Sequence, residues 1–145
     1  MAHPMKQLKK EYPVVLSQDI IWGDMDAFGH INNTVYFRYF EDARIAYFDQ
    51  IGVHEHKKQF GVGPILATTQ CNFRLPLDYP DHIHIATRSG ILSPKKFNME
   101  FVVFSERHGA ITAEGDGLIV YYDYANGKSC EIPDAIVTAI KKLER

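Results

Sequence analysis

Apolar and polar residues follow two different periods along this chain, and these periods predict one long helix and several strands. Residues 12–21 are rich in β-branched and apolar types, which is typical of a strand. From Val35 to Ile51 the apolar positions recur with helical spacing, and Gly52 is placed to end the helix in a left-handed conformation. Because aromatic residues lie on several sides of this helix, we expect it to be buried rather than to lie on the surface.

The second half of the chain has the pattern of long strands separated by short turns. Breaks rich in Pro, Gly, Asn, Asp and Lys separate the apolar runs. The predicted strands are residues 63–74, 82–91, 98–106 and 110–124. Their short connections favour an antiparallel meander. At the end of the chain, residues 133–143 predict a short amphipathic helix.

These elements predict an α+β fold in which one antiparallel β-sheet wraps around one long central α-helix. Such an arrangement buries the helix and one face of the sheet in a single core. The length of 145 residues is close to that of one domain, so we expect residues 1–145 to form a single domain. The sheet keeps exposed edge strands, and pairing across a dimer is a common way to cover them.

The composition is that of an ordinary globular protein. Apolar residues make up 46% and charged residues 23%, with a formal net charge of -2, so nothing favours nucleic acid or a membrane surface as a partner. No apolar run approaches the roughly 20 residues that span a bilayer, and residues 1–11 do not resemble a signal peptide. Cys71 and Cys130 fit free thiols in a reducing compartment, so we expect a cytoplasmic protein.

The loop before the long helix carries the candidate chemistry. Asp26 precedes the helix N-terminus, where Asn32 or Asn33 can act as the N-cap. Free backbone N–H groups of a first helical turn can hold an oxyanion, and Gly29 lets the backbone approach a substrate closely. A carboxylate beside such donors suffices for acyl transfer. The alternative is structural, with Asp26 as a turn former and the asparagines as ordinary caps.

The motif WGDMDAFGHINN at residues 22–33, followed by an aromatic helix that begins near Tyr36, resembles the signature of the 4-hydroxybenzoyl-CoA thioesterase family. Members of that family have the hotdog fold. The resemblance implies an acyl-CoA thioesterase without a cofactor, in which Asp26 is the nucleophile or general base and the Asn33 N–H is the oxyanion donor. It also implies an active site between two protomers, so that a homodimer is the smallest assembly and a homotetramer is the alternative.

Part of the same motif, His30-Ile31-Asn32-Asn33, also resembles that of acyl-ACP thioesterases, which pair the Asp with an Asn two residues later and a His. Here that Asn position holds Phe28, which favours the simpler Asp-dependent mechanism. His30 then positions water or Asp26, or packs beside the loop. Three alternatives stay open: an acyl-ACP thioesterase, a non-catalytic hotdog module that binds acyl-CoA, and a hydratase or dehydratase on the same fold.

Further residues are substrate-binding candidates by resemblance. The segment Ser93-Pro94-Lys95-Lys96 resembles the turn where relatives place Ser or basic groups near the nucleotide end of CoA. Lys95 and Lys96 are therefore expected to meet CoA phosphates, the alternative being solvated surface lysines. Tyr36 is a candidate for the acyl pocket, or else a core residue.

Two histidine pairs raise the question of a metal. His82 and His84 share one face of a predicted strand, and His54 and His56 form a second alternating pair. No carboxylate or cysteine completes a recognisable site with either pair, and a structural zinc ion needs four ligands, so no metal is predicted. A Gly-Xaa-Ser-Xaa-Gly motif is absent from the sequence, which argues against a serine hydrolase.

Overall fold

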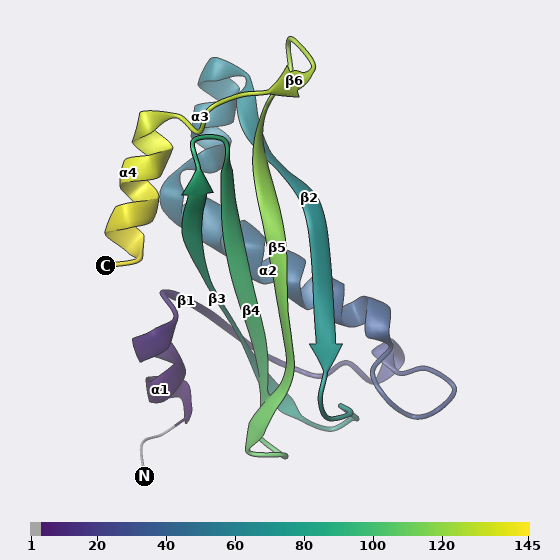
Figure 1. Ribbon diagram of the computed structural model, residues 1–145. Helices are drawn as coiled ribbons and strands as arrows, with labels where there is room; N and C mark the ends of the chain where they lie inside the picture. Colours follow the sequence, from purple (N-terminus) through teal and green to yellow (C-terminus); the bar gives the residue numbers. More distant parts are fainter. Residues whose placement is uncertain (1–3) are drawn as a thin grey trace.

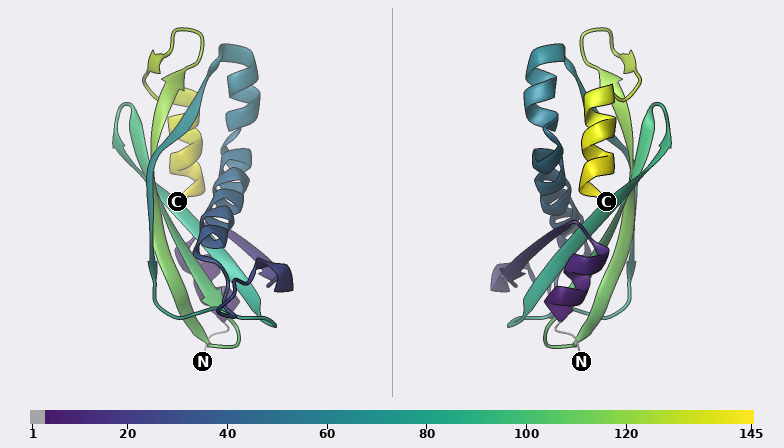
Figure 2. Two further views of the ribbon diagram at one scale, coloured as in Figure 1. Left: turned by 90° about the vertical axis from the view of Figure 1, so that its right-hand side faces the viewer. Right: turned by 90° about the vertical axis from the view of Figure 1, so that its left-hand side faces the viewer.

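The computed structural model in Figure 1 describes residues 4–145. In chain order its elements are α1 (Pro4–Glu11), β1 (Val14–Asp19), the short 3₁₀ helix η1 (Trp22–Asp24), α2 (Asn33–Ile51), α3 (Val53–Phe60), β2 (Val62–Phe73), β3 (His82–Ser93), β4 (Lys96–Ser105), β5 (Ala110–Asp123), β6 (Lys128–Ser129) and α4 (Asp134–Leu143). One curved sheet wraps around the long helix α2. The two side views in Figure 2 show this sheet from its edges. The predicted α+β architecture is confirmed.

All strand pairs are antiparallel, and the strands lie in the order β1-β3-β4-β5-β2, with β6 paired to β5. Strands β3, β4 and β5 form the predicted meander. The prediction was wrong for β2, which pairs with β5 rather than with its neighbour in sequence, β3. The connection between β2 and β3 holds two prolines and is longer than a hairpin turn, so it carries the chain past the ends of β5 and β4.

The core lies between α2 and the face of the sheet that it covers. Phe40 of α2 is fully buried and stacks on Phe101 of β4, with ring centroids 4.8 Å apart. Gly115 of β5 permits this close approach, because a Cβ there would lie 2.4 Å from the Phe40 ring. On the opposite side of α2, Glu41 and Asp42 are exposed, so the helix is buried on one side only and the expectation of full burial was wrong for the single chain.

The other face of the sheet carries α1, which the sequence analysis missed. Leu8 of α1 and Tyr12 pack with Ala86 and Val102 in a second, smaller apolar cluster. The helix α3 was also missed, because residues 54–59 show only a polar stretch. Both helices are short and rich in Lys, Gln and Glu, which are good helix formers but leave little apolar periodicity.

The remaining expectations about the elements are confirmed. The helix α4 covers residues 134–143, and Gly52 ends α2 with a φ of 77°. Both cysteines are free thiols. Of the helices in the described part of the chain, none is both long and apolar enough to cross a membrane.

Candidate active site

The loop that carries Asp26 is closed by its own backbone. The Asp26 N–H donates to the His30 carbonyl over 2.9 Å, and the Gly29 N–H donates to the Asp26 carbonyl over 3.1 Å. Met25 and Ile31 form an isolated antiparallel β-bridge at the base of the loop. Gly29 has a φ of 79°, a left-handed conformation that suits glycine. The loop is therefore a defined turn, which fixes where the side chains of Asp26 and His30 begin.

The base of this loop is anchored to the segment between β2 and β3. The Ile31 N–H donates to the Leu77 carbonyl over 2.7 Å, and the Asn32 N–H donates to the Asp24 carbonyl over 3.0 Å. Ile31 and Leu77 are both buried. The catalytic candidates thus lie on an exposed turn, and the residues at the base of this turn are part of the core.

The first turn of α2 begins directly after the loop. Asn32 is the N-cap: its Oδ1 accepts from the Thr34 N–H at 3.0 Å, and its carbonyl accepts from the Val35 N–H at 3.0 Å. Asn33 is the first helical residue. Within residues 4–145, the Asn33 N–H has no hydrogen-bond acceptor. It lies at the positive end of the helix dipole, so it is available to a negatively charged ligand oxygen.

A cleft of about 320 Å³ joins these groups. Such a volume is at the small end for a ligand pocket. The lining residues are Asp26, His30, Ile31, Asn33, Tyr36, Phe73, Arg74, Leu75 and Pro76. The structure therefore brings together four of the predicted site residues, Asp26, His30, Asn33 and Tyr36, and places Gly29 in the turn beside them.

The Asp26 carboxylate accepts one hydrogen bond from the described residues. Its Oδ1 accepts from the Phe28 N–H at 2.9 Å, a bond within the loop itself. The carboxylate is exposed and its second oxygen faces no donor of the described chain. A carboxylate held at one oxygen and open at the other can act as a base or a nucleophile. Asp24, the other acid of the loop, does not line the cleft.

Tyr36 forms the inner wall of the cleft. Its ring meets that of Phe73 edge to face, with centroids 5.0 Å apart. Burial raises the pKa of Tyr36 to about 12, and the nearby thiol of Cys71 adds to the shift. The phenol therefore stays neutral at physiological pH. Tyr39 is also buried, and burial likewise raises its pKa, but it belongs to the core and does not line the cleft.

The far wall of the cleft was not predicted from the sequence. Phe73, Arg74 and Leu75 lie at the end of β2, and Arg74 forms an ion pair with Glu114 of β5 at 3.1 Å. Their proximity to Asp26 depends on the pairing of β2 with β5, for which a single sequence holds no local signal. The segment was recognised only as a strand that ends in a turn.

The candidates Ser93, Lys95 and Lys96 lie at the opposite end of the sheet, at the turn between β3 and β4. Lys96 is paired with Val120 on β5, whereas Phe73 of the cleft is paired with Ala113. At about 3.4 Å per residue, these two rows are about 24 Å apart along β5. Figure 1 shows the turn at the top and the Asp26 loop at the lower right. A single chain therefore does not bring these three residues to Asp26.

Comparison with known proteins shows that this chain matches one protein family in sequence and one fold in structure. The family model described as the thioesterase-like superfamily matches residues 20–140. A thioesterase from Thermus thermophilus, solved with coenzyme A and Zn, is 27% identical, has a TM-score of 0.79, and the match covers 93% of this chain and 97% of that one. A DHNA-CoA thioesterase from Staphylococcus aureus is 18% identical, with 90% of both chains covered and a TM-score of 0.79.

A 1,4-dihydroxy-2-naphthoyl-CoA thioesterase from Synechocystis has the same fold at 13% identity, with 91% of this chain and 98% of that chain covered and a TM-score of 0.80. At such low identity these last two structures establish the fold alone. The predicted hotdog architecture is thereby confirmed.

Proposed function

Because the chain belongs to the thioesterase-like superfamily, we propose that this thioester hydrolase cleaves an acyl-CoA to the free acid and CoA. The coenzyme A bound to the Thermus thermophilus relative supports CoA as the carrier. The observation that carries the proposal is the shared cleft of Asp26 and Asn33, which pairs an open carboxylate with an open backbone donor. We place the enzyme in the cytoplasm, supported by the free thiols Cys71 and Cys130.

In this mechanism the thioester carbonyl lies between Asp26 and the first turn of α2. Asp26 either removes a proton from a water that attacks the carbonyl carbon, or attacks it directly to form an anhydride that water then opens. The carbonyl oxygen becomes negative and accepts a hydrogen bond from the Asn33 N–H, supported by the helix dipole. The C–S bond then breaks, the thiolate of CoA leaves with the electron pair, and it takes up a proton.

The remaining cleft residues have supporting roles. His30 lines the cleft, and no hydrogen bond joins its ring to Asp26 among the described residues, so we assign it to the positioning of water rather than to proton transfer with Asp26. Tyr36 and Phe73 form an apolar wall for the acyl group. We expect His30→Ala to lower kcat by less than about tenfold, well below the effect of losing the carboxylate.

A homodimer places a second copy at the cleft. Strand β2 lies at the end of the sheet order and pairs only with β5, so its outer edge is open. Ile65, Phe73 and Leu75 expose apolar surface along this edge, although such edges are normally protected. Antiparallel pairing of two β2 edges brings the Phe73 end of one chain to the Ile65 end of the other. A homotetramer of two such dimers is the alternative assembly.

This pairing also gives the distant CoA candidates a role. Lys96 lies in the same row of the sheet as Ile65, because both are paired with Val120. Ser93, Lys95 and Lys96 of the partner subunit then lie on the side from which the nucleotide end of CoA extends. Residues 66–70 of the partner subunit help to close the cleft. The lysines act as point charges for CoA phosphates.

The deciding experiment measures thiol release from a panel of aliphatic and aromatic acyl-CoAs and from acyl-ACP. Wild type is compared with Asp26→Asn, and Asp24→Asn is the control, since it makes the same change in the same loop outside the cleft. We expect turnover on acyl-CoA, a loss of about a hundredfold or more in Asp26→Asn, and near wild-type rates in Asp24→Asn.

The other outcomes are equally informative. Faster turnover of acyl-ACP than of any acyl-CoA would contradict CoA as the carrier of the acyl group, but it would still agree with thioester hydrolysis. Binding of acyl-CoA without thiol release would make the protein a binding module. Equal rates in Asp26→Asn and wild type would remove Asp26 from the mechanism.

A further inference from the structure

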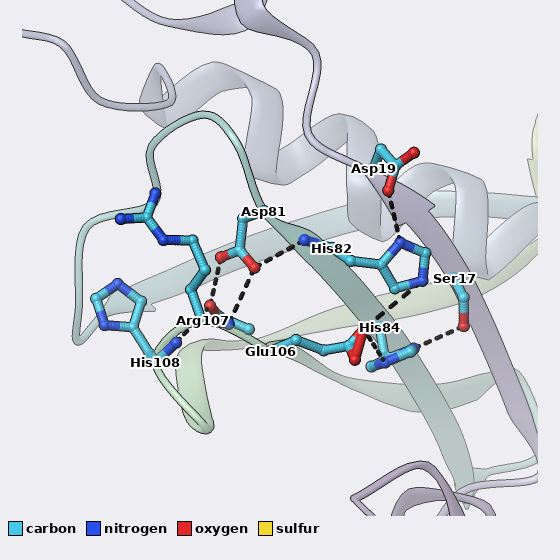
Figure 3. Close-up of polar contacts among 9 residues, drawn as sticks. Ser17, Asp19, Asp81, His82, His84, Glu106, Arg107 and His108 are labelled. Carbon is cyan, nitrogen blue, oxygen red and sulfur yellow. Dashed lines mark hydrogen bonds and ion pairs between the residues drawn. The ribbon is translucent and has the colours of Figure 1, made fainter.

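Two histidines and a glutamate meet on the sheet (Figure 3). None of the three lines the Asp26 cleft. His82 and His84 belong to β3, and Glu106 directly follows β4. The Glu106 Oε2 lies 3.5 Å from the His84 Nε2 and 3.9 Å from the His82 Nε2. One potential ligand atom from each of the three residues lies within 4.8 Å of the other two. The tertiary structure thus brings to the two histidines a carboxylate that is distant from them in the sequence.

Strand register explains why these side chains share a surface. Ile83 and Ile85 point into the core beneath α2, so His82 and His84, which alternate with them, point to the opposite face. The Glu106 N–H donates to the His82 carbonyl over 3.0 Å, which places Glu106 beside His82. The cluster is therefore on the face of the sheet that α2 does not cover.

A second layer of oxygen atoms orients both imidazole rings. The Nδ1 of His82 is 2.7 Å from Asp19 Oδ1, and the Nδ1 of His84 is 2.7 Å from Ser17 Oγ. Both oxygens come from β1, where Asp19 and Ser17 are paired directly with His82 and His84. With Nδ1 held in this way, the Nε2 of each ring is directed at Glu106. Histidines that bind metals usually have such a partner on the second nitrogen.

Asp81 holds the glutamate side of the cluster in place. Its carboxylate accepts hydrogen bonds from the Ser105 hydroxyl, from the His82 N–H at 2.7 Å and from the Arg107 N–H at 3.1 Å. These bonds tie the residues on either side of Glu106 to the start of β3. The backbone of the cluster is thus fixed before any ligand binds, which favours affinity.

We propose that His82, His84 and Glu106 bind a divalent transition-metal ion of the zinc type. Two imidazoles and one carboxylate form a donor set that Zn²⁺ uses, with the fourth position left to water. Bonds of about 2.0–2.1 Å place the ligand atoms of a tetrahedral ion about 3.3 Å apart. The Glu106 Oε2 lies 3.5 and 3.9 Å from the two Nε2 atoms, so these two separations exceed the tetrahedral value by about 0.2–0.6 Å. All three ligand atoms lie within 4.8 Å of one another, so the remaining adjustment is a rotation of the side chains. His82 and Glu106 are both about half exposed, which leaves an entry path.

The location indicates what the ion does. The bound ion connects β3 with the turn after β4. Through the hydrogen bonds of Asp19 and Ser17 to the two histidines, it also stabilises the position of the edge strand β1. The cluster is on the other sheet face from α2, whereas the Asn33 donor lies on α2 itself. The ion therefore stabilises the fold and takes no part in thioester cleavage, so this proposal does not depend on the proposed function.

The test uses the full chain freed of metal and titrated with Zn²⁺ by calorimetry and with Co²⁺ by visible absorption. We expect one ion per chain, a Co²⁺ spectrum of a four-coordinate site, and a rise of about 9 °C in Tm at a zinc concentration about a hundredfold above Kd. The double variant His82→Ala/His84→Ala should lower affinity by about a hundredfold or more, while the matched control His54→Ala/His56→Ala should not.

Two milder variants keep the proposal testable if the double variant does not fold, since His84 is buried. Glu106→Gln removes a charged ligand at the surface and should abolish the Co²⁺ spectrum. Asp19→Asn leaves all three ligands and should weaken binding by about tenfold through the second layer. The proposal is overturned if no stoichiometric ion binds, or if Glu106→Gln and wild type bind equally.

Discussion

The backbone N–H of Asp26 donates to the carbonyl of His30 over 2.9 Å, and this bond helps to close the turn that presents both side chains to the cleft. The two side chains do not bond to each other among the described residues. Their relative position is instead set by the backbone of the turn and by the β-bridge between Met25 and Ile31. Activity should therefore be sensitive to changes in the turn that leave the catalytic side chains intact.

The first prediction concerns Gly29. A Cβ at Gly29 meets no atom within 4 Å, but its φ of 79° disfavours other residues by about 1–2 kcal/mol. We expect Gly29→Ala to lower the free energy of unfolding by about 1 kcal/mol and kcat by about tenfold, because a displaced carboxylate is misaligned. Gly90→Ala, at an equally open position without the left-handed φ, is the control. Wild-type kcat in Gly29→Ala would contradict the role of the turn.

The second prediction separates CoA recognition from chemistry. Lys95→Ala/Lys96→Ala should raise KM for acyl-CoA by about tenfold with little change in kcat, since each lost charge–phosphate contact weakens binding. The same variant should process an acyl-pantetheine, which lacks the nucleotide, as well as wild type does. Lys141→Ala/Lys142→Ala, in the last turn of α4, is the matched control. An equal effect on both substrates would exclude a phosphate contact.

A third prediction tests the contact between α2 and the sheet. A Cβ on Gly115 would lie 2.4 Å from the Gln70 carbonyl oxygen and 2.4 Å from the Phe40 ring, so Gly115→Ala should lower the free energy of unfolding by about 3 kcal/mol. Gly117→Ala comes closest to the flexible end of Leu66, at 3.0 Å, and should cost about 1 kcal/mol or less. Denaturant unfolding gives both values, and equal costs would contradict this account.

The fourth prediction is a loss of stability at alkaline pH. Burial raises the pKa of Tyr36 from 10.0 to about 12. Between these values the unfolded chain releases the phenol proton while the native state retains it, so stability is complete below pH 10 and falls as pH rises toward 12. Tyr36→Phe should remove at most about 2 kcal/mol of this loss. The free energy of unfolding of wild type and of Tyr36→Phe is measured at about pH 9, 10 and 11, which gives the slope of stability against pH for each protein. The difference in stability between the two proteins at about pH 7 is the baseline. An unchanged pH dependence would contradict the burial of this phenol.

Elements whose signals are local could be predicted from the amino-acid sequence. The helical spacing from Val35, the glycine at position 52 and the long apolar runs of β2 to β5 each depend on neighbours within one element. The same holds for Asp26 and Asn33, because a loop that leads directly into a helix brings its residues to the helix N-terminus. The two short helices α1 and α3 escaped detection since they carry too few apolar residues to show a period.

Contacts between residues that are distant in sequence became known only with the folded structure. Side chains alternate between the two faces of a strand, so His82 and His84 of β3 lie on the same face. Glu106, Asp19 and Ser17 lie beside them only because of the register in which β1, β3 and β4 pair. In the same way, Arg74 reaches the cleft because β2 crosses to β5 instead of pairing with β3. Strand pairing is set by the burial of a whole core rather than by any short segment, so these contacts leave no signal in the local sequence.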